Sequence, residues 1–439
     1  MKSNSVWLNY IPLVFSILLL MAHFLRADNY GAIAFWGAVP FVLLLRKAWA
    51  TRVLQLLLAI GAIIWIKTAF SIAQVRLEYG ESWLRMALIL AAVSSMTIWA
   101  ALTFQKSNLR ERFLPTDSVN KPSIIAFMLT AGILAIAYYK VSFPIIITER
   151  ILPGTAWVGI LILGIYAGWI TEKLLDRRQT HIWRKRIWIV FSAVFFSQLL
   201  LGLLGLDRFL MTGDLHLPVP AMIIAGPLFR GEGLFMPILF LSTLLLVGPA
   251  WCSYLCYIGS WDYLASTKKR KPKPLPKWSC KVRWLILILI PLVALSLRLS
   301  GVPTVLATLS GIAFGLAGVA LMLLWSSRVG AMTHCVIWCP IGLVANWLGK
   351  ISPFRIRIDD SCDECGACSL ACRYDALNIR DIQNRKPSLS CTLCGDCLKR
   401  CQSQSIGYRF LKLNPETARV VFITMVAALH AAFLGVARI

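Results

Sequence analysis

The chain has 439 residues, of which 58% are hydrophobic and 15% are charged, and its formal net charge is +25. This hydrophobic share lies well above ordinary globular usage and excludes an ordinary soluble protein. The positive charge would suit nucleic acid, but its placement in alternate loops between apolar segments is typical of membrane topology signals, so no nucleic-acid partner is expected.

Apolar stretches that can span a bilayer recur along the chain, and we expect about 11 transmembrane helices. The first apolar run lacks a small-residue cleavage site, so it is interpreted as a helix and not as a signal peptide. The fold class predicted is an all-α polytopic membrane protein with a small cytoplasmic α+β two-cluster ferredoxin-like domain. The predicted spans are approximately 7–25, 30–45, 53–75, 83–104, 123–143, 155–174, 187–206, 234–251, 284–300, 303–325 and 418–437.

The basic residues predict the orientation of these helices. They gather in loops around residues 46–52, 106–112, 177–186 and 268–277, which all fall on one side if the helices alternate. The positive-inside rule places that side in the cytoplasm. We therefore expect a multi-pass protein of the bacterial inner membrane whose N-terminus and whose segment before the last helix are cytoplasmic.

One loop on the opposite side is a candidate site for a quinone. Residues 207–233 mix apolar and polar groups and contain three prolines. His216, with Asp214 nearby, could exchange protons with a quinol, since imidazole titrates near neutral pH. The alternative is a plain connecting loop with an exposed histidine, which the sequence favours because nothing fixes the geometry.

Two further motifs repeat where helices meet the cytoplasm. Cys252 and Cys256, and again Cys335 and Cys339, belong to the pattern C-x3-C-x-I-G, and the two copies are 83 residues apart. Spacing of four places both sulfurs of a motif on one helical face. Four thiolates could hold an iron–sulfur cluster or another metal, or form reversible disulfides. The alternative is four small buried residues at tight helix ends. Cys280, alone in a basic loop, is expected to be structural.

Two runs near the C-terminus carry the strongest chemical signal. Each reads C-x2-C-x2-C-x3-C, the spacing of a two-cluster [4Fe–4S] ferredoxin, in which the fourth cysteine ligates the other cluster. A zinc ribbon needs no third x2-spaced cysteine, and disulfides need an oxidising compartment. The predicted ligands are Cys362, Cys365, Cys368 and Cys401 for the first cluster, and Cys391, Cys394, Cys397 and Cys372 for the second.

These features predict four regions. Residues 1–180 are expected to be N-terminal transmembrane helices, and 181–349 transmembrane helices with the paired C-x3-C motifs. Residues 350–415 form the ferredoxin segment, and 416–439 the last transmembrane helix. A unit of about 65 residues has little apolar core, so bound clusters would contribute to its folding.

The combination of paired C-x3-C motifs and a C-terminal two-cluster segment, over about 185–410, resembles the NapH/NosR-type membrane-bound polyferredoxins. The resemblance implies quinol oxidation and electron supply to a reductase, and all 12 signature cysteines have matches. The chain departs from the pattern at Tyr257, where the family has the proline found at Pro340. It departs again at Arg373 and Gln402, which replace the proline that commonly follows the fourth cysteine.

The function predicted is therefore membrane-integral iron–sulfur electron transfer between the quinone pool and a redox partner, as a subunit of a quinol-linked oxidoreductase. Its cofactors would be two [4Fe–4S] clusters and a possible third site at the C-x3-C pairs. The expected partners are membrane lipid, quinone, and a cytoplasmic or periplasmic redox protein. The alternative is an assembly or maturation factor that supplies electrons or metal to a partner enzyme.

Overall fold

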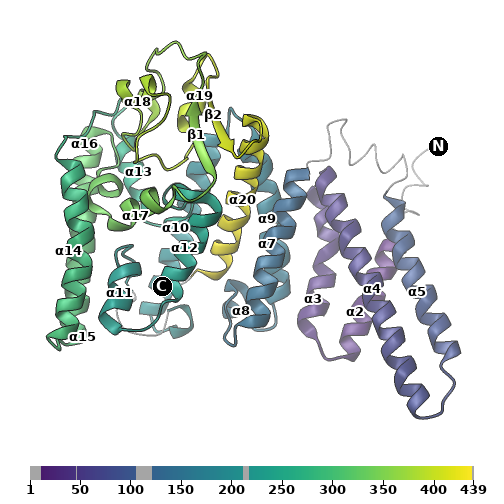
Figure 1. Cartoon of the computed structure of the whole chain (residues 1–439). Coiled ribbons are helices and arrows are strands. Elements are labelled where there is room, and N and C mark those ends of the chain that lie inside the picture. Colours follow the sequence, from purple (N-terminus) through teal and green to yellow (C-terminus); the bar gives the residue numbers. More distant parts are fainter. Residues whose placement is uncertain (1–10, 46, 105–120, 211–216, 438–439) are drawn as a thin grey trace. The chain divides into compact units, whose positions relative to one another are not determined.

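The computed structural model describes residues 11–45, 47–104, 121–210 and 217–437, and these are mostly helical (Figure 1). In this part of the chain, nine helices are long and apolar enough to cross a membrane. They coincide with the third to eleventh predicted spans. The first two predicted spans are shorter apolar helices, Ile11–Arg26 and Tyr30–Leu45. The N-terminal ten residues, like His216, Asp214 and the basic loop around 106–112, lie outside the described residues.

The chain forms two compact units, Met1–Glu172 and Lys173–Ile439. The first contains no cysteine. Asn29 begins its second described helix, because the side-chain oxygen accepts a hydrogen bond from the N–H of Ala32 (3.0 Å), as N-cap residues do. The elements of this unit are α2 (Ile11–Arg26), α3 (Tyr30–Ala38), η1 (Val39–Leu45), α4 (Ala48–Glu78), α5 (Leu84–Thr103), α7 (Lys121–Lys140), α8 (Ile147–Ile151) and α9 (Ala156–Leu175).

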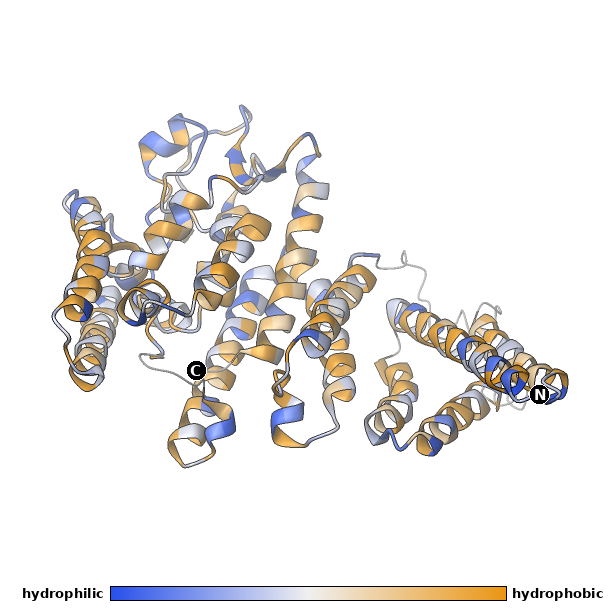
Figure 2. Ribbon diagram, turned by 60° about the horizontal axis from the view of Figure 1, so that its bottom comes forward, coloured by the Kyte–Doolittle hydropathy of each residue, from blue (hydrophilic) through white to orange (hydrophobic). Residues whose placement is uncertain are grey.

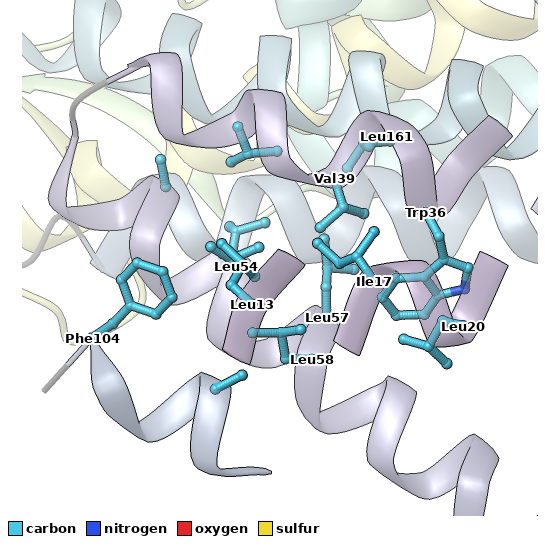
Figure 3. Close-up of a cluster of buried hydrophobic side chains, with 14 of the residues drawn as sticks. Leu13, Ile17, Leu20, Trp36, Val39, Leu54, Leu57, Leu58, Phe104 and Leu161 are labelled. Carbon is cyan, nitrogen blue, oxygen red and sulfur yellow. The ribbon is translucent and has the colours of Figure 1, made fainter. Parts of the chain in front are cut away.

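An apolar core holds the first unit together. Leu20 of α2, Trp36 of α3 and Leu58 of α4 are almost fully buried within it, and Figure 3 shows their side chains turned toward one another. Burial of each such side chain stabilises the fold by roughly 1.5–3 kcal/mol. The unit is thus a helical bundle whose stability comes from apolar packing.

The second unit contains all 13 cysteines. Its helices carry the C-x3-C motifs, and the segment with the two strands lies at one end of them (Figure 1). The elements are α10 (Thr180–Leu203), η2 (Asp207–Phe209), α11 (Met222–Arg230), α12 (Phe235–Val247), η3 (Gly248–Ala250), η4 (Trp251–Leu255), α13 (Gly259–Thr267), α14 (Ser279–Leu299), α15 (Thr304–Leu321), η5 (Met322–Ser326), α16 (Ser327–Val329), η6 (His334–Trp338), α17 (Pro340–Leu348), β1 (Phe354–Ile358), η7 (Ser369–Ala371), α18 (Ile379–Gln383), α19 (Asp396–Arg400), β2 (Ile406–Phe410) and α20 (Pro415–Val436).

The outer faces of these helices have the surface of membrane helices. Leu285, Ile288 and Leu292 of α14 are each more than half exposed. Figure 2 shows apolar residues along the helices and hydrophilic residues gathered in the segment from β1 to β2. A soluble protein rarely exposes continuous apolar surface of this extent. The apolar helices indicate a membrane protein.

A two-stranded antiparallel sheet joins the ends of the ferredoxin segment. β1 pairs with β2 in a register that sets Phe354 opposite Phe410 and Ile358 opposite Ile406. Alternate residues face inward, and Tyr408 of β2 stacks on Phe422 of α20 with ring centroids 4.6 Å apart. Helix α20 thereby packs against one face of the sheet.

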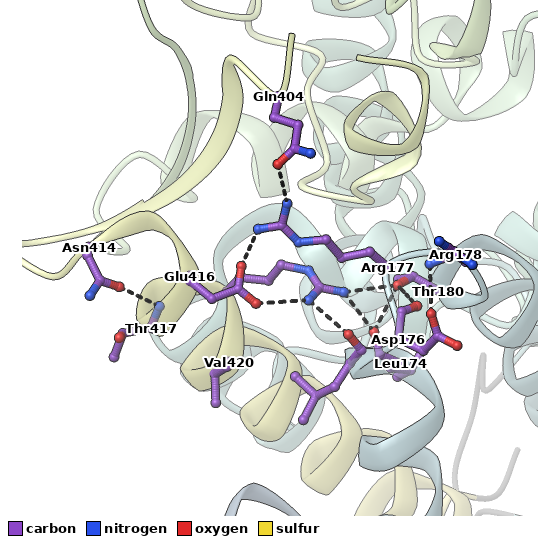
Figure 4. Close-up of polar contacts among 12 residues, drawn as sticks. Leu174, Asp176, Arg177, Arg178, Thr180, Gln404, Asn414, Glu416, Thr417 and Val420 are labelled. Atoms are coloured by element: carbon purple, nitrogen blue, oxygen red, sulfur yellow. Dashed lines mark hydrogen bonds and ion pairs between the residues drawn. The ribbon is translucent and has the colours of Figure 1, made fainter. Parts of the chain in front are cut away.

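Polar contacts tie the start of α20 to the start of α10 (Figure 4). The Arg419 guanidinium donates to the carbonyl oxygen of Leu174 (3.1 Å) and to the Thr180 hydroxyl (3.0 Å). Arg177 pairs with the Glu416 carboxylate. Because Arg419 is almost fully buried, its contacts satisfy a charge that would otherwise be costly in this position. The last helix is therefore held in place at the end nearest the ferredoxin segment.

Candidate functional site

The two C-x3-C motifs adopt the same local structure. Each forms a single π-helical turn, η4 and η6. The turns are closed by hydrogen bonds from Cys256 N–H to Trp251 O (2.9 Å) and from Cys339 N–H to His334 O (2.8 Å). The second cysteines share one extended conformation, with φ −79° and ψ 119° or 113°. Single π-helical turns are rare and frequently mark functional sites.

The glycine of each motif is required by the close approach of the first cysteine's backbone. A Cβ atom on Gly342 would lie 2.6 Å from the carbonyl oxygen of Cys335, and one on Gly259 would lie 3.0 Å from that of Cys252. Both distances join equivalent positions, seven residues apart. The sequence repeat is therefore a repeat of structure, because each copy brings its glycine back against its own first cysteine.

A helix begins just after each second cysteine. Pro340 is the first residue of α17, where its missing N–H costs nothing. In the other motif Tyr257 takes the place of proline and the helix begins two residues later, at Gly259, yet Cys256 keeps the conformation of Cys339. Helix N-termini stabilise thiolates. The tyrosine in place of proline therefore moves the helix start without changing the conformation of the cysteine.

The four thiols of these motifs are close enough to raise one another's pKa. Burial raises the pKa of Cys335 well above its usual value, and the charges of Asp262, Cys256, Cys339 and Cys252 raise it further. Burial likewise raises the pKa of Cys256 to about 12, with a further contribution from Cys339. A thiol becomes a ligand only as a thiolate. A site with these pKa values needs a cation or a cluster to hold its thiols deprotonated.

Arg283 of α14 supplies a positive charge at this site. Its side chain is 6% exposed, and its Nε and Nη2 atoms have no hydrogen-bond partner among the described residues. It interacts electrostatically with Cys252 and Cys339. An unpaired buried cation costs several kcal/mol. These residues fit a group of net negative charge held by the four thiols.

Asp262 fastens one motif to the other. Its carboxylate, on the helix that follows Cys256, accepts hydrogen bonds from the backbone N–H of Cys335 (2.9 Å) and from the Ser326 hydroxyl (2.6 Å). Burial raises the pKa of Asp262 to about 6, against these hydrogen bonds, which lower it. The two motifs are thus brought together by a direct side-chain contact.

The two ferredoxin runs share a second structural repeat. Glu364 (φ 54°) and Gly366 (φ 71°) flank the second cysteine of the first run, and Leu393 (φ 56°) and Gly395 (φ 78°) flank that of the second. Corresponding positions are 29 residues apart, from 364 to 393 and from 366 to 395. Left-handed residues within turns direct successive N–H groups into one concavity, a recurrent feature of iron–sulfur sites. Both loops have this form.

One group of thiols combines cysteines of the second run with the last cysteine of the first run. Burial raises the pKa of Cys397 well above its usual value, and the charges of Cys394, Cys391 and Cys372 raise it further. The N–H of Ala376 donates to the Cys372 sulfur (3.2 Å). Cys372 therefore lies with the cysteines of the second run.

The other group combines cysteines of the first run with the last cysteine of the second run. Burial raises the pKa of Cys368, and the thiols of Cys362 and Cys401 add to the rise. Cys365, in the same loop, is exposed. The hydroxyl of Ser405 lies 3.3 Å from the Cys401 sulfur. This group is the more open of the two.

Direct contacts connect the C-x3-C motif of η4 to the second ferredoxin loop. Two side-chain hydrogen bonds cross between them, from the Tyr254 hydroxyl to the carbonyl oxygen of Cys394 (3.1 Å) and from the Ser253 hydroxyl to that of Thr392 (2.9 Å). A third joins η4 to the residues just after the first run, from the Tyr374 hydroxyl to the carbonyl oxygen of Cys252 (3.4 Å). The C-x3-C site and the second thiol group are neighbours.

Two arginines dock the ferredoxin segment on the helices. Arg184 of α10 forms a buried, bidentate pair with Asp396 of α19, at 2.6 and 3.2 Å. Arg373, which stands where ferredoxins commonly have proline, donates to the carbonyl oxygens of Lys269 (2.8 Å) and Gly330 (2.7 Å). The sequence indicates only that Arg373 replaces this proline. In the fold it attaches the segment to two loops of the membrane body.

All 13 cysteines are free thiols, so the structure contains no disulfide. Among the described residues, no three His, Cys, Asp or Glu side chains converge tightly enough to hold a single metal ion. A [4Fe–4S] cube is larger than one ion and takes one thiolate at each of four corners. Cys280 is exposed at the start of α14.

A comparison with known families bears on these motifs. A family described as "4Fe-4S binding domain" matches residues 229–274 and 309–359. The chain carries a 4Fe–4S binding domain. The matched stretches contain Cys252, Cys256, Cys335 and Cys339, and they end before the first ferredoxin run. The family match therefore falls on the C-x3-C motifs, which the sequence alone left open between a ligand site and buried packing.

Two curated proteins are similar to the chain. "Putative electron transport protein YccM" of Escherichia coli (strain K12) is 26% identical over 46% of this chain and 58% of its own length. "Uncharacterized protein MJ0749" of Methanocaldococcus jannaschii is 24% identical over 39% of this chain and 68% of its own length. No solved structure matches. Together, the findings support an iron–sulfur electron-transport protein.

Proposed function

We propose that the chain passes electrons between the membrane quinone pool and a redox partner protein, through three iron–sulfur clusters held by three groups of four cysteines. The contact that carries this proposal joins η4 to the second ferredoxin loop, where Tyr254 bonds to Cys394 and Ser253 to Thr392. Such contacts give a short path between neighbouring redox groups. The proposal is further supported by the 4Fe–4S family match and by the name of the E. coli relative.

Each cluster, when bound, supplies a one-electron carrier whose potential depends on hydrogen bonds and charge around it. Contacts of the chain's own residues support an order for the three groups. The C-x3-C thiols lie among the helices with Arg283, the second ferredoxin loop is hydrogen-bonded to the motif of η4, and the group of exposed Cys365 is the most open to solvent and is taken as the outermost. In this order the outermost group exchanges electrons with a soluble partner, and the buried group with the membrane.

The finer assignments extend this proposal. The resemblance to NapH/NosR-type polyferredoxins supports quinol as the membrane reactant, and the basic loops support a ferredoxin segment on the cytoplasmic face of a bacterial inner membrane. The role would be that of the membrane subunit of a quinol-linked oxidoreductase.

Metal analysis tests the number of clusters. Protein purified without oxygen should absorb near 400 nm and contain about twelve iron and twelve sulfide per chain if three cubes are bound. Replacing Cys252 and Cys339 together with serine should remove about four of each. Cys280→Ser is the matched control and should change neither value. Wild-type protein without iron would exclude the proposal.

Turnover separates electron transfer from an assembly role. Protein in liposomes should oxidise a quinol with a dye as the electron acceptor, and the Cys252 and Cys339 double variant should not. Iron-loaded protein without turnover, together with loss of the cofactor from a partner enzyme when the gene is deleted, would favour the maturation factor instead.

A further inference from the structure

A hollow of about 420 Å³ lies between the end of α17 and the ferredoxin segment. Asn346 lines it from α17, Lys350 from the turn that follows α17, Arg357 from β1, and Lys386 and Cys391 from the loop after α18. The volume falls within the range of small-molecule sites. The hollow is distinct from the three thiol groups, although Cys391 borders it.

The polar groups of the hollow are available to a ligand. Lys350, Arg357 and Lys386 are exposed, and none of the three has an ion-pair partner among the described residues. Asn346 is 5% exposed, and its Oδ1 atom has no hydrogen-bond partner within the described chain. The one acidic lining residue, Asp381, already accepts a hydrogen bond from the Asn378 N–H (2.8 Å) in a helix cap.

The surroundings place this hollow at the level of lipid headgroups. Trp347 and Ile351 flank Lys350 and are 55% and 66% exposed. Exposed tryptophan beside a lysine is typical of the boundary between hydrocarbon and water. Helix α17 also follows the cysteine motif of η6, which comes shortly after the apolar helix Thr304–Val329.

We propose that the hollow binds the phosphate headgroup of an anionic phospholipid. Lys350, Arg357 and Lys386 would bind the phosphate, as basic pockets at the cytoplasmic side of membrane proteins do. Asn346 Oδ1 would accept a hydrogen bond from a headgroup hydroxyl, and the acyl chains would lie along Trp347. The proposal needs no cluster, so it stands or fails separately from electron transfer.

Lipid binding by the full-length protein tests this site. Native mass spectrometry would compare phosphatidylglycerol with phosphatidylcholine of the same acyl chains. We expect the wild type to prefer phosphatidylglycerol, and the variant Lys350→Gln, Arg357→Gln, Lys386→Gln to lose roughly 100-fold in affinity for it. The matched control, Lys271→Gln, Lys277→Gln, Lys281→Gln, removes the same charge from the exposed basic loop before α14 and the first turn of that helix, and it should bind as the wild type does.

Four results would overturn the proposal. Two are equal binding of the two lipids and unchanged binding by the triple variant. The third is displacement of phosphatidylglycerol by an equal concentration of inorganic phosphate, which would identify a site for free phosphate, and the fourth is binding of an acidic protein in place of lipid. If the triple variant does not fold, Lys386→Gln alone should weaken binding about fivefold.

Discussion

Arg283 is a charge that the fold places among four thiols. Nothing in its sequence context marks it, since it lies at the end of a basic loop, directly before an apolar run. In the structure it is buried and faces Cys252 and Cys339. Such a charge favours the more negative state of a bound cluster, which is the reduced state.

Removing this charge should lower the reduction potential of the cluster at the C-x3-C site. For Arg283→Met we expect a decrease on the order of 100 mV. At an effective dielectric constant near 20, a unit charge several ångströms from the cluster still has an appreciable interaction energy with it. A redox titration followed by electron paramagnetic resonance measures the shift. Arg283→Lys, which keeps the charge, should shift the potential much less; an equal shift in both variants would contradict the electrostatic role.

Gly342 occupies a position where the structure leaves no room for a side chain. Gly342→Ala should destabilise the motif by roughly 1–3 kcal/mol, because its Cβ would lie 2.6 Å from the Cys335 carbonyl oxygen and the backbone would have to move. Thermal unfolding and iron content measure the effect.

Gly132 of α7 provides the matched control. A Cβ there meets nothing within 4 Å, so Gly132→Ala should stabilise its helix by about 0.5–1 kcal/mol. If both alanine variants behaved alike, the close approach at Gly342 would not be the cause.

At the scale of elements, the pair of Arg184 and Asp396 joins α10 to α19. The two side chains are 0% and 12% exposed. Arg184→Met should weaken the docking of the ferredoxin segment by about 3–5 kcal/mol, because it leaves the Asp396 carboxylate buried without its partner. Hydrogen exchange of the α19 amides should accelerate by more than about 100-fold.

Two further variants separate the contribution of the charge pair from that of packing. Adding Asp396→Leu to Arg184→Met should restore most of the protection, since the unpaired charge is removed. Arg409→Met breaks a pair with Asp359 whose members are 43% and 44% exposed, and it should cost less than about 1 kcal/mol. Lack of rescue by the double variant would show that packing, and not charge, holds the segment.

At the scale of the whole molecule, the predicted redox residues all lie in one of the two compact units. Residues 173–439 contain every cysteine. We expect this unit, produced without residues 1–172, to insert into membranes and to bind the same amount of iron as the full chain. The reason is that its core, its ferredoxin segment and its last helix contact one another.

Iron and sulfide analysis of the shortened protein, beside the full chain, measures this expectation. Quinol turnover of both forms then reports on the first unit. Loss of iron upon shortening would show that the first unit is needed for the fold of the second.

Much of the fold followed from apolar length and cysteine spacing. Nine predicted spans are helices of spanning length, because about 20 apolar residues satisfy their own backbone in a membrane only as a helix. The first two predicted spans are apolar helices of fewer than 18 described residues, Ile11–Arg26 and Tyr30–Leu45, and the second passes from α3 into a 3₁₀ segment after Ala38.

The sequence by itself determined which thiols could act as ligands, because each motif lies within a few residues and its spacing is local. The tertiary structure decided what surrounds them. Arg283, Asp262 and Arg184 reach the cysteine motifs from elements distant in the chain. Spacing carries no information about such contacts, since they depend on how helices pack. For that reason only the fold shows that the two kinds of cysteine motif are neighbours.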